Sequence, residues 1–103
     1  MKDIEATRGK SRRPTPPGEL LAEDILPATG LNKSEIAKLL GISRQSLYDI
    51  LNCHQPVTPQ MAVRMGKLFG NGASLWLNMQ SAHDLWIAER TVDTSNITTL
   101  DHV

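Results

Sequence analysis

The segment from Lys33 to Asn52 constrains the fold most, because its apolar spacing fits two short helices joined by a sharp turn. Ala37 is small where one helix approaches the other, and Gly41 lies where the chain must turn without a Cβ clash. An ordinary helical hairpin satisfies the same spacing, so the outer face must decide whether the motif is a helix-turn-helix. The apolar positions are Ile36, Leu40, Ile42, Leu47 and Ile50.

The second helix of this motif carries polar groups that can contact DNA. In a helix-turn-helix, its first two turns lie against base edges in the major groove. We expect Arg44 to pair bidentately with guanine and Gln45 with adenine. Lys33 and Ser43 open their helices, where free NH groups point outward, so we expect them to hold phosphates. A solvated face is the alternative for each residue. The predicted DNA-binding residues are Lys33, Ser43, Arg44, Gln45, Ser46, Tyr48 and Asp49.

Start and stop signals delimit one helix before the motif. Residues 15–19 open this helix with two prolines, and Pro27 and Gly30 close it. Asn32 and Glu35 then have the spacing of a capping box, in which each side chain satisfies a backbone NH at the start of the next helix. Three residues of the first helix are expected to face the core: Leu20, Leu21 and Ile25.

Two further helices follow the motif. Thr58 caps the first of them and Gly70 stops it. Residues 71–74 start the last helix, which holds both tryptophans, Trp76 and Trp86. Its apolar stripe either packs in the core or forms part of a two-fold dimer interface, and the sequence leaves both readings open. The residues assigned to core or dimer contacts are Leu75, Trp76, Met79 and Trp86.

Length and charge limit the organisation of the chain. With 103 residues, of which 40% are hydrophobic, we expect one small all-α domain over residues 14–90. Residues 1–13 are predicted to be a flexible basic arm, and residues 91–103 a flexible tail or a short strand formed on a partner. The net charge is zero, but residues 1–13 and 30–70 each carry five basic and two acidic groups. Affinity for DNA should therefore depend on specific contacts and on dimerisation.

Residue types and spacing argue against catalysis and metal binding. His54, His83 and His102 have no partner four residues away, and Cys53 is the single cysteine. The sequence has neither a glycine-rich phosphate loop nor a nucleophile elbow, so we expect no enzyme, no cofactor and no metal. No stretch approaches the ~18 apolar residues of a membrane helix, and we expect a soluble, cytoplasmic protein without membrane contact.

One stretch outside the helix-turn-helix is much more specific than any helix-turn-helix alone: the WLN.Q motif of Trp76-Leu77-Asn78 and Gln80, followed by Asp84-Leu85-Trp86. With this stretch and the helix-turn-helix together, the sequence resembles HigA-type antitoxins of the Xre helix-turn-helix class, from bacterial type II toxin-antitoxin systems. The resemblance covers about residues 12–90. It is carried by Arg13-Pro14-Thr15, Pro17-Gly18-Glu19, Leu31 to Asn52, Thr58, Ala62, Arg64, Trp76-Leu77-Asn78, Gln80 and Asp84-Leu85-Trp86.

The resemblance implies a five-helix domain of the lambda-repressor type that forms a homodimer on double-stranded operator DNA in its own promoter. It also implies neutralisation of a HigB-like ribonuclease toxin. A stand-alone transcriptional regulator and a toxin-binding module with little DNA binding remain alternatives. Where the family usually has glycine and basic residues after the third helix, this chain has residues 53–56, CHQP, so fewer phosphate contacts are expected. Asn52 is expected to take the positive φ that the glycine would adopt.

Overall fold

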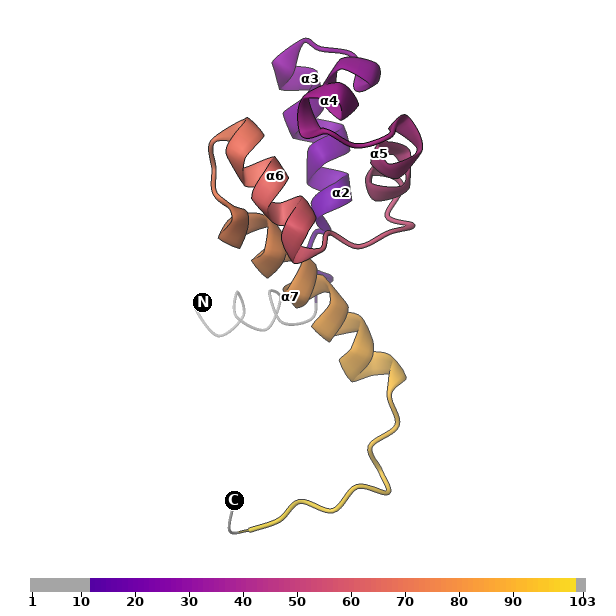
Figure 1. Ribbon diagram of the computed structural model, residues 1–103. Helices are drawn as coiled ribbons and strands as arrows, with labels where there is room; N and C mark the ends of the chain where they lie inside the picture. The colour runs from indigo at the N-terminus through magenta and orange to yellow at the C-terminus, as the bar shows by residue number, and fades with distance from the viewer. Residues whose placement is uncertain (1–11, 102–103) are drawn as a thin grey trace, which may run out of the picture.

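The computed structural model describes residues 12–101, and in this range the regular structure is entirely helical. The predicted all-α fold is confirmed: α2, η1 and α3 run on as one helical segment, and four separate helices follow it (Figure 1). The predictions made for residues 1–11 and 102–103 lie outside the described residues. The bounds are α2 Pro17–Leu20, η1 Leu21–Ile25, α3 Leu26–Thr29, α4 Lys33–Leu40, α5 Arg44–Leu51, α6 Pro59–Phe69 and α7 Ala73–Thr91.

The first helical segment passes through Pro27 instead of ending there, so that part of the prediction is wrong. A proline inside an α-helix has no NH to donate, and its ring collides with the carbonyl four residues earlier. Here η1 is a π-helical turn, in which the NH of Leu26 donates to the carbonyl of Leu21. The wider turn directly precedes the proline, and the segment ends at Gly30 with φ +72°.

Side-chain caps define the starts of α4, α5 and α6. Asn32 and Glu35 form both bonds of the capping box, with Asn32 Oδ1 2.9 Å from the NH of Glu35 and Glu35 Oε1 3.1 Å from the NH of Asn32. Ser43 and Thr58 each accept a bond from the backbone NH three residues later. Gly41 ends α4 in the left-handed conformation.

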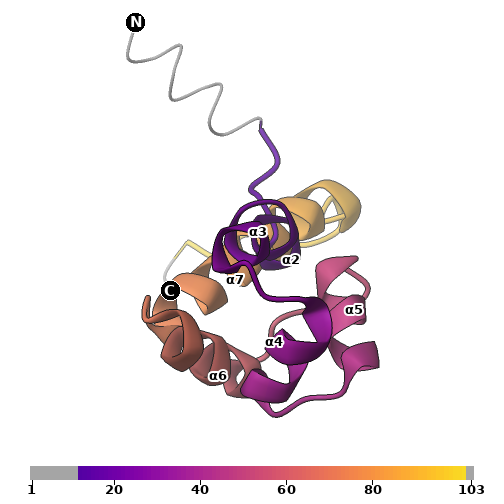
Figure 2. The ribbon, with the colours of Figure 1, turned by 90° about the horizontal axis from the view of Figure 1, so that it is seen from above.

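One hydrophobic core joins all the helical segments. Trp76 is fully buried in this core, its Nε1 donates to Asn71 Oδ1 at 2.8 Å, and its ring lies 5.9 Å from that of Phe69. Both views place α5 and α6 on opposite sides of the bundle (Figures 1 and 2). The buried hydrophobic residues are Leu21, Leu26, Ile36, Ala37, Leu40, Leu47, Ile50, Leu51, Val57, Ala62, Met65 and Trp76.

The long helix α7 packs against α6 and α2 with its first half, and its second half extends away from the other helices (Figure 1). Residues 92–101 continue beyond it with neither helix nor strand. None of the helices in residues 12–101 is long and apolar enough to cross a membrane. The second half of α7 and the residues after it expose large apolar side chains: Leu85, Ile87, Val92, Ile97 and Leu100.

Candidate nucleic-acid interface

Close backbone packing holds α5 in place against the rest of the fold. Gly18 of α2 lies so near α5 that a Cβ at this position would overlap the carbonyl oxygen of Ile50. Arg64 of α6 donates to the carbonyl of Leu40 at 2.8 Å, which satisfies a free carbonyl at the end of α4. The α4–Gly41–α5 unit is therefore held from two sides, and its outer face has a defined orientation.

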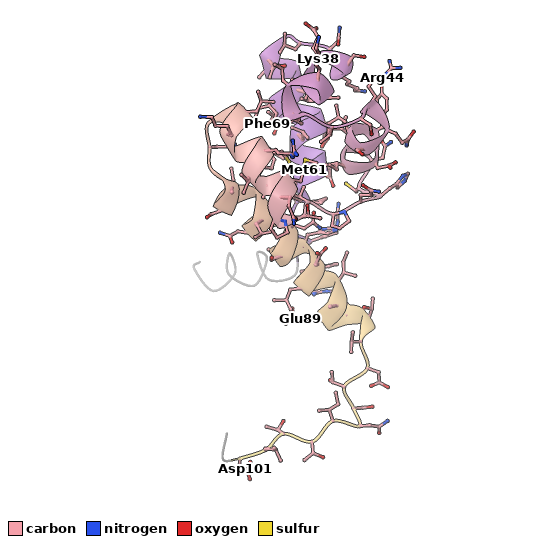
Figure 3. The ribbon with its side chains drawn as sticks, in the orientation of Figure 1. Lys38, Arg44, Met61, Phe69, Glu89 and Asp101 are labelled. Carbon is pink, nitrogen blue, oxygen red and sulfur yellow. The ribbon has the colours of Figure 1, made fainter. Side chains whose placement is uncertain are left out.

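The two faces of α5 differ as a recognition helix requires. Leu47, Ile50 and Leu51 are buried, whereas Arg44 and Gln45 in the first turn are exposed. Tyr48 is 38% exposed, and Ser46 and Asp49 are half-buried. Arg44 lies at the outer edge of the bundle (Figure 3). Arg44, Gln45 and Tyr48 form the outer face of α5, and Ser46 and Asp49 lie beside it. The structure thus brings the predicted DNA contacts of this helix onto or next to one face.

Arg44 and Gln45 each have a polar partner within the chain. One guanidinium nitrogen of Arg44 lies 3.3 Å from the hydroxyl of Ser34 in α4, a long bond on an exposed surface. Gln45 Nε2 donates to Asp49 Oδ1, one helical turn later, at 2.9 Å. Both side chains keep further donors, and Gln45 keeps its Oε1 acceptor, because each contact uses a fraction of the available hydrogen-bonding groups.

The two predicted phosphate ligands are engaged in local contacts. Ser43 Oγ accepts from the NH of Ser46 and donates to the hydroxyl of Ser46 at 2.9 Å, so its role in this structure is to cap α5. Lys33 Nζ lies 5.5 Å from the centre of the Tyr48 ring, within the range of a cation–π contact. Lys33 nevertheless remains exposed and carries its charge at the edge of the outer face.

The loop after α5 corrects one expectation. Asn52 has φ −89°, and Cys53 adopts the positive φ, +60°. The backbone NH groups of His54 and Gln55 both donate to the carbonyl of Asp49, which fixes where the chain reverses. Partial burial raises the pKa of the Cys53 thiol, and the nearby Glu19 carboxylate raises it further.

A cavity of about 320 Å³ separates this loop from α7. On its α7 side, Gln80 accepts a bond from the NH of Val57 at 2.8 Å and donates to Asp84 at 2.9 Å. His83 Nδ1 lies 3.1 Å from the carbonyl oxygen of Pro14. Sequence reasoning assigned no role to Gln80 or His83, although Gln80 belongs to the WLN.Q motif. Both tie other segments to α7. Within residues 12–101, no cluster of His, Cys, Asp and Glu is arranged to hold a metal ion.

The four residues assigned to core or dimer contacts occupy different environments. Trp76 lies in the core, Met79 is half-buried, and Leu75 is 42% exposed. Trp86 is half-buried on the projecting part of α7, where the guanidinium of Arg90 lies 3.7 Å from the centre of its ring. The basic and acidic ends are separated: Lys38 and Arg44 lie at one end of the molecule, and Glu89 and Asp101 at the other (Figure 3).

Comparison with known proteins finds relatives that also contain a helix-turn-helix. The family model for bacterial regulatory proteins of the Fis family matches residues 23–49. An uncharacterized HTH-type transcriptional regulator of Escherichia coli, YbaQ, is 37% identical over 82% of this chain and 74% of its own length. The antitoxin HigA-1 of Vibrio cholerae is 32% identical over 77% of this chain and 74% of its own length.

A solved structure shows the same fold on DNA. PA4674 of Pseudomonas aeruginosa, crystallised in complex with its operator DNA, is 31% identical and superposes with a TM-score of 0.72. The alignment covers 76% of this chain and 86% of that one.

Proposed function

Because this chain belongs to the Xre-like helix-turn-helix family that includes the HigA antitoxins and YbaQ-type regulators, we propose that it is a sequence-specific DNA-binding antitoxin. In this proposal it represses its own operon as a homodimer and neutralises a HigB-type ribonuclease toxin. Relatives of the chain are DNA-binding regulators and antitoxins, so no enzymatic activity is assigned to it. The observation that carries the proposal is the outer face of α5, whose exposed polar side chains lie on a rigidly packed helix.

Sequence recognition is assigned to the first turn of α5. Arg44 offers a planar pair of donors for guanine, and Gln45 offers one donor and one acceptor for adenine. Lys33, together with the backbone NH groups at the start of α4, is assigned to phosphate contacts. The chain has no net charge, so weak non-specific binding is expected and the specific contacts must supply most of the useful affinity.

Dimerisation is assigned to the end of the molecule that lies away from α5. The projecting half of α7 and the residues after it expose apolar side chains that find no core within the chain; Leu85, for example, is 60% exposed. A two-fold pairing there would double the number of base contacts, because each subunit would present one α5 to a half-site.

The proposal is tested by co-expressing the chain with the neighbouring open reading frame and purifying one protein through a tag. We expect the second protein to co-purify, and the complex to retard the upstream DNA of the gene in a gel-shift at a stated salt concentration. If neither protein partner nor retardation is found at micromolar protein, the proposal fails.

A stand-alone transcriptional regulator is the second candidate, and the similarity to YbaQ favours it. The same experiment separates the two. A stand-alone regulator retards its upstream DNA, but no product of the neighbouring gene co-purifies with it. An antitoxin retards the DNA and also co-purifies with that product.

A third candidate is a toxin-binding module with little DNA binding. Its support is that residues 53–56 contain neither Lys nor Arg, together with the zero net charge. This candidate predicts co-purification of the toxin without retardation of the DNA.

A further inference from the structure

Asp49 is an acidic residue in an unfavourable place. It stands in the last turn of α5, where the helix dipole favours cations, and α5 has no basic residue in that turn. It also lies beside the outer face of α5, where its charge would be repelled by DNA phosphates. A carboxylate that is unfavourable on both counts needs a compensating contact, and within residues 12–101 its hydrogen-bond partner is Gln45 Nε2, at 2.9 Å.

This contact determines which way the Gln45 amide faces. An ionised carboxylate only accepts hydrogen bonds, so the NH₂ group of Gln45 must turn toward Asp49. The Oε1 atom then points to the other side, and one Nε2 hydrogen remains available. In a free glutamine the amide can flip and present either group outward. In this chain the carboxylate of Asp49 selects one orientation.

The selected orientation suits one base. Adenine presents a donor at N6 and an acceptor at N7 in the major groove, which match the free acceptor and the remaining donor of Gln45. Guanine presents two acceptors, N7 and O6, so the fixed Oε1 would face another acceptor. A flipped or rotating amide would tolerate guanine, whereas the fixed amide opposes it.

We propose that Asp49 is a positioning residue that makes Gln45 select adenine over guanine at one operator position, without contacting the DNA itself. This inference rests on the proposed DNA-binding function. It differs from the prediction that Asp49 is one of the DNA contacts, because its effect passes through the amide of Gln45.

The test compares the full-length wild type, Q45A and D49A on duplexes selected from a randomised library. The position at which Q45A loses the preference for adenine identifies the base that Gln45 contacts. We expect D49A to lose the adenine-over-guanine preference at that same position by about fivefold or more. Preferences at other positions should stay within twofold, because within residues 12–101 the hydrogen-bond partner of the Asp49 carboxylate is Gln45.

A double-mutant cycle and two conservative variants separate positioning from direct contact. In the Q45A background, D49A should have no further effect on base preference, because the group that it positions is gone. D49E keeps an acceptor within reach on the same helix face and should retain most of the preference. D49N should lose much of it, since an asparagine amide can satisfy either orientation of Gln45.

Three outcomes would overturn the inference. Additive losses in the cycle would show that Asp49 contacts DNA on its own. A uniform gain in affinity for all sequences in D49A, with adenine preference retained, would show that Asp49 acts as a repelling charge alone. A wild type that selects no sequence from the library overturns the proposed function and this inference with it, and that result is visible before any variant is made.

Discussion

Cys53 holds a backbone conformation that is costly for a residue with a Cβ. Its φ of +60° brings a cost of about 1–2 kcal/mol that glycine avoids, although glycine loses about 0.5–1 kcal/mol through the greater freedom of its unfolded chain. We therefore expect C53G to raise the free energy of unfolding in urea by about 0.5–1 kcal/mol. The matched control is N52G, at φ −89°, which should lower it by about the same amount. If N52G instead raised the free energy of unfolding and C53G lowered it, the positive φ would lie at Asn52.

The thiol of Cys53 should be less reactive than a free cysteine thiol. Burial and the Glu19 carboxylate both disfavour the thiolate and so raise the pKa of Cys53. Since the thiolate is the nucleophile, alkylation by iodoacetamide should need a higher pH in the folded protein than in the same protein unfolded in urea. Rate constants measured from pH 7 to 10 test this. A folded-state midpoint at or below the unfolded one would contradict the assigned environment.

Arg44 should contribute more to DNA binding than its charge alone. If it pairs bidentately with guanine, R44A should lose about 1–3 kcal/mol of operator affinity and relax specificity at one base position. The matched control is K67A, which removes one exposed positive charge from α6, on the other side of the bundle. K67A should leave base preference unchanged. Wild-type binding of R44A to operator and scrambled DNA would refute the proposed orientation of α5.

Individual residues were predictable where the cause is local. The capping box of Asn32 and Glu35 follows from residue types three positions apart, and the structure forms both of its bonds. The position of positive φ was misplaced by one residue, because it depends on the NH groups of His54 and Gln55 reaching the carbonyl of Asp49. Residue type favoured Asn52, and this backbone geometry placed the reversal at Cys53.

At the scale of the helices, Gly18 is needed because α2 and α5 meet backbone to backbone. A Cβ there would overlap the carbonyl oxygen of Ile50, which cannot move without shifting α5. G18A should therefore cost about 3 kcal/mol of stability, at the upper end for overpacking. Gly70 is the control: it has φ +74° but open space around it, so G70A should cost about 1 kcal/mol from backbone strain alone. Equal losses in urea unfolding would mean that the helices do not pack so closely.

Helix number and most helix ends were predictable from apolar periodicity, prolines and glycines. The continuation of the first helical segment through Pro27 was not predictable, because it depends on a π turn that changes which carbonyl the helix NH groups reach. The contacts of Gly18 and Gln80 could not be predicted from the sequence either. Gln80 bonds to the NH of Val57, 23 residues earlier in the chain, and no local pattern indicates such a contact.

Over the whole molecule, the sequence showed which segments are basic or acidic, but it did not show how far apart these segments lie in the fold. Residues 30–70, which include the helix-turn-helix, carry five basic and two acidic groups, and residues 71–103 carry one basic and four acidic groups. The structure adds that α7 carries the acidic, apolar end away from α5 (Figure 3). The face proposed for DNA and the surface proposed for dimerisation are thus separate, so each can be altered without changing the other.

That separation makes the proposed dimer testable. We expect L85E to place a charge in the apolar contact between two subunits, so that the mass in sedimentation falls from twice 11.4 kDa to 11.4 kDa. Operator affinity should fall on the order of a hundredfold, because two α5 helices would no longer be linked, while base preference within a half-site remains. V63E is the matched control, since Val63 is 62% exposed on α6 and should tolerate the charge. A wild type that is already monomeric, or an L85E variant that stays dimeric, would exclude the projecting part of α7 as the interface.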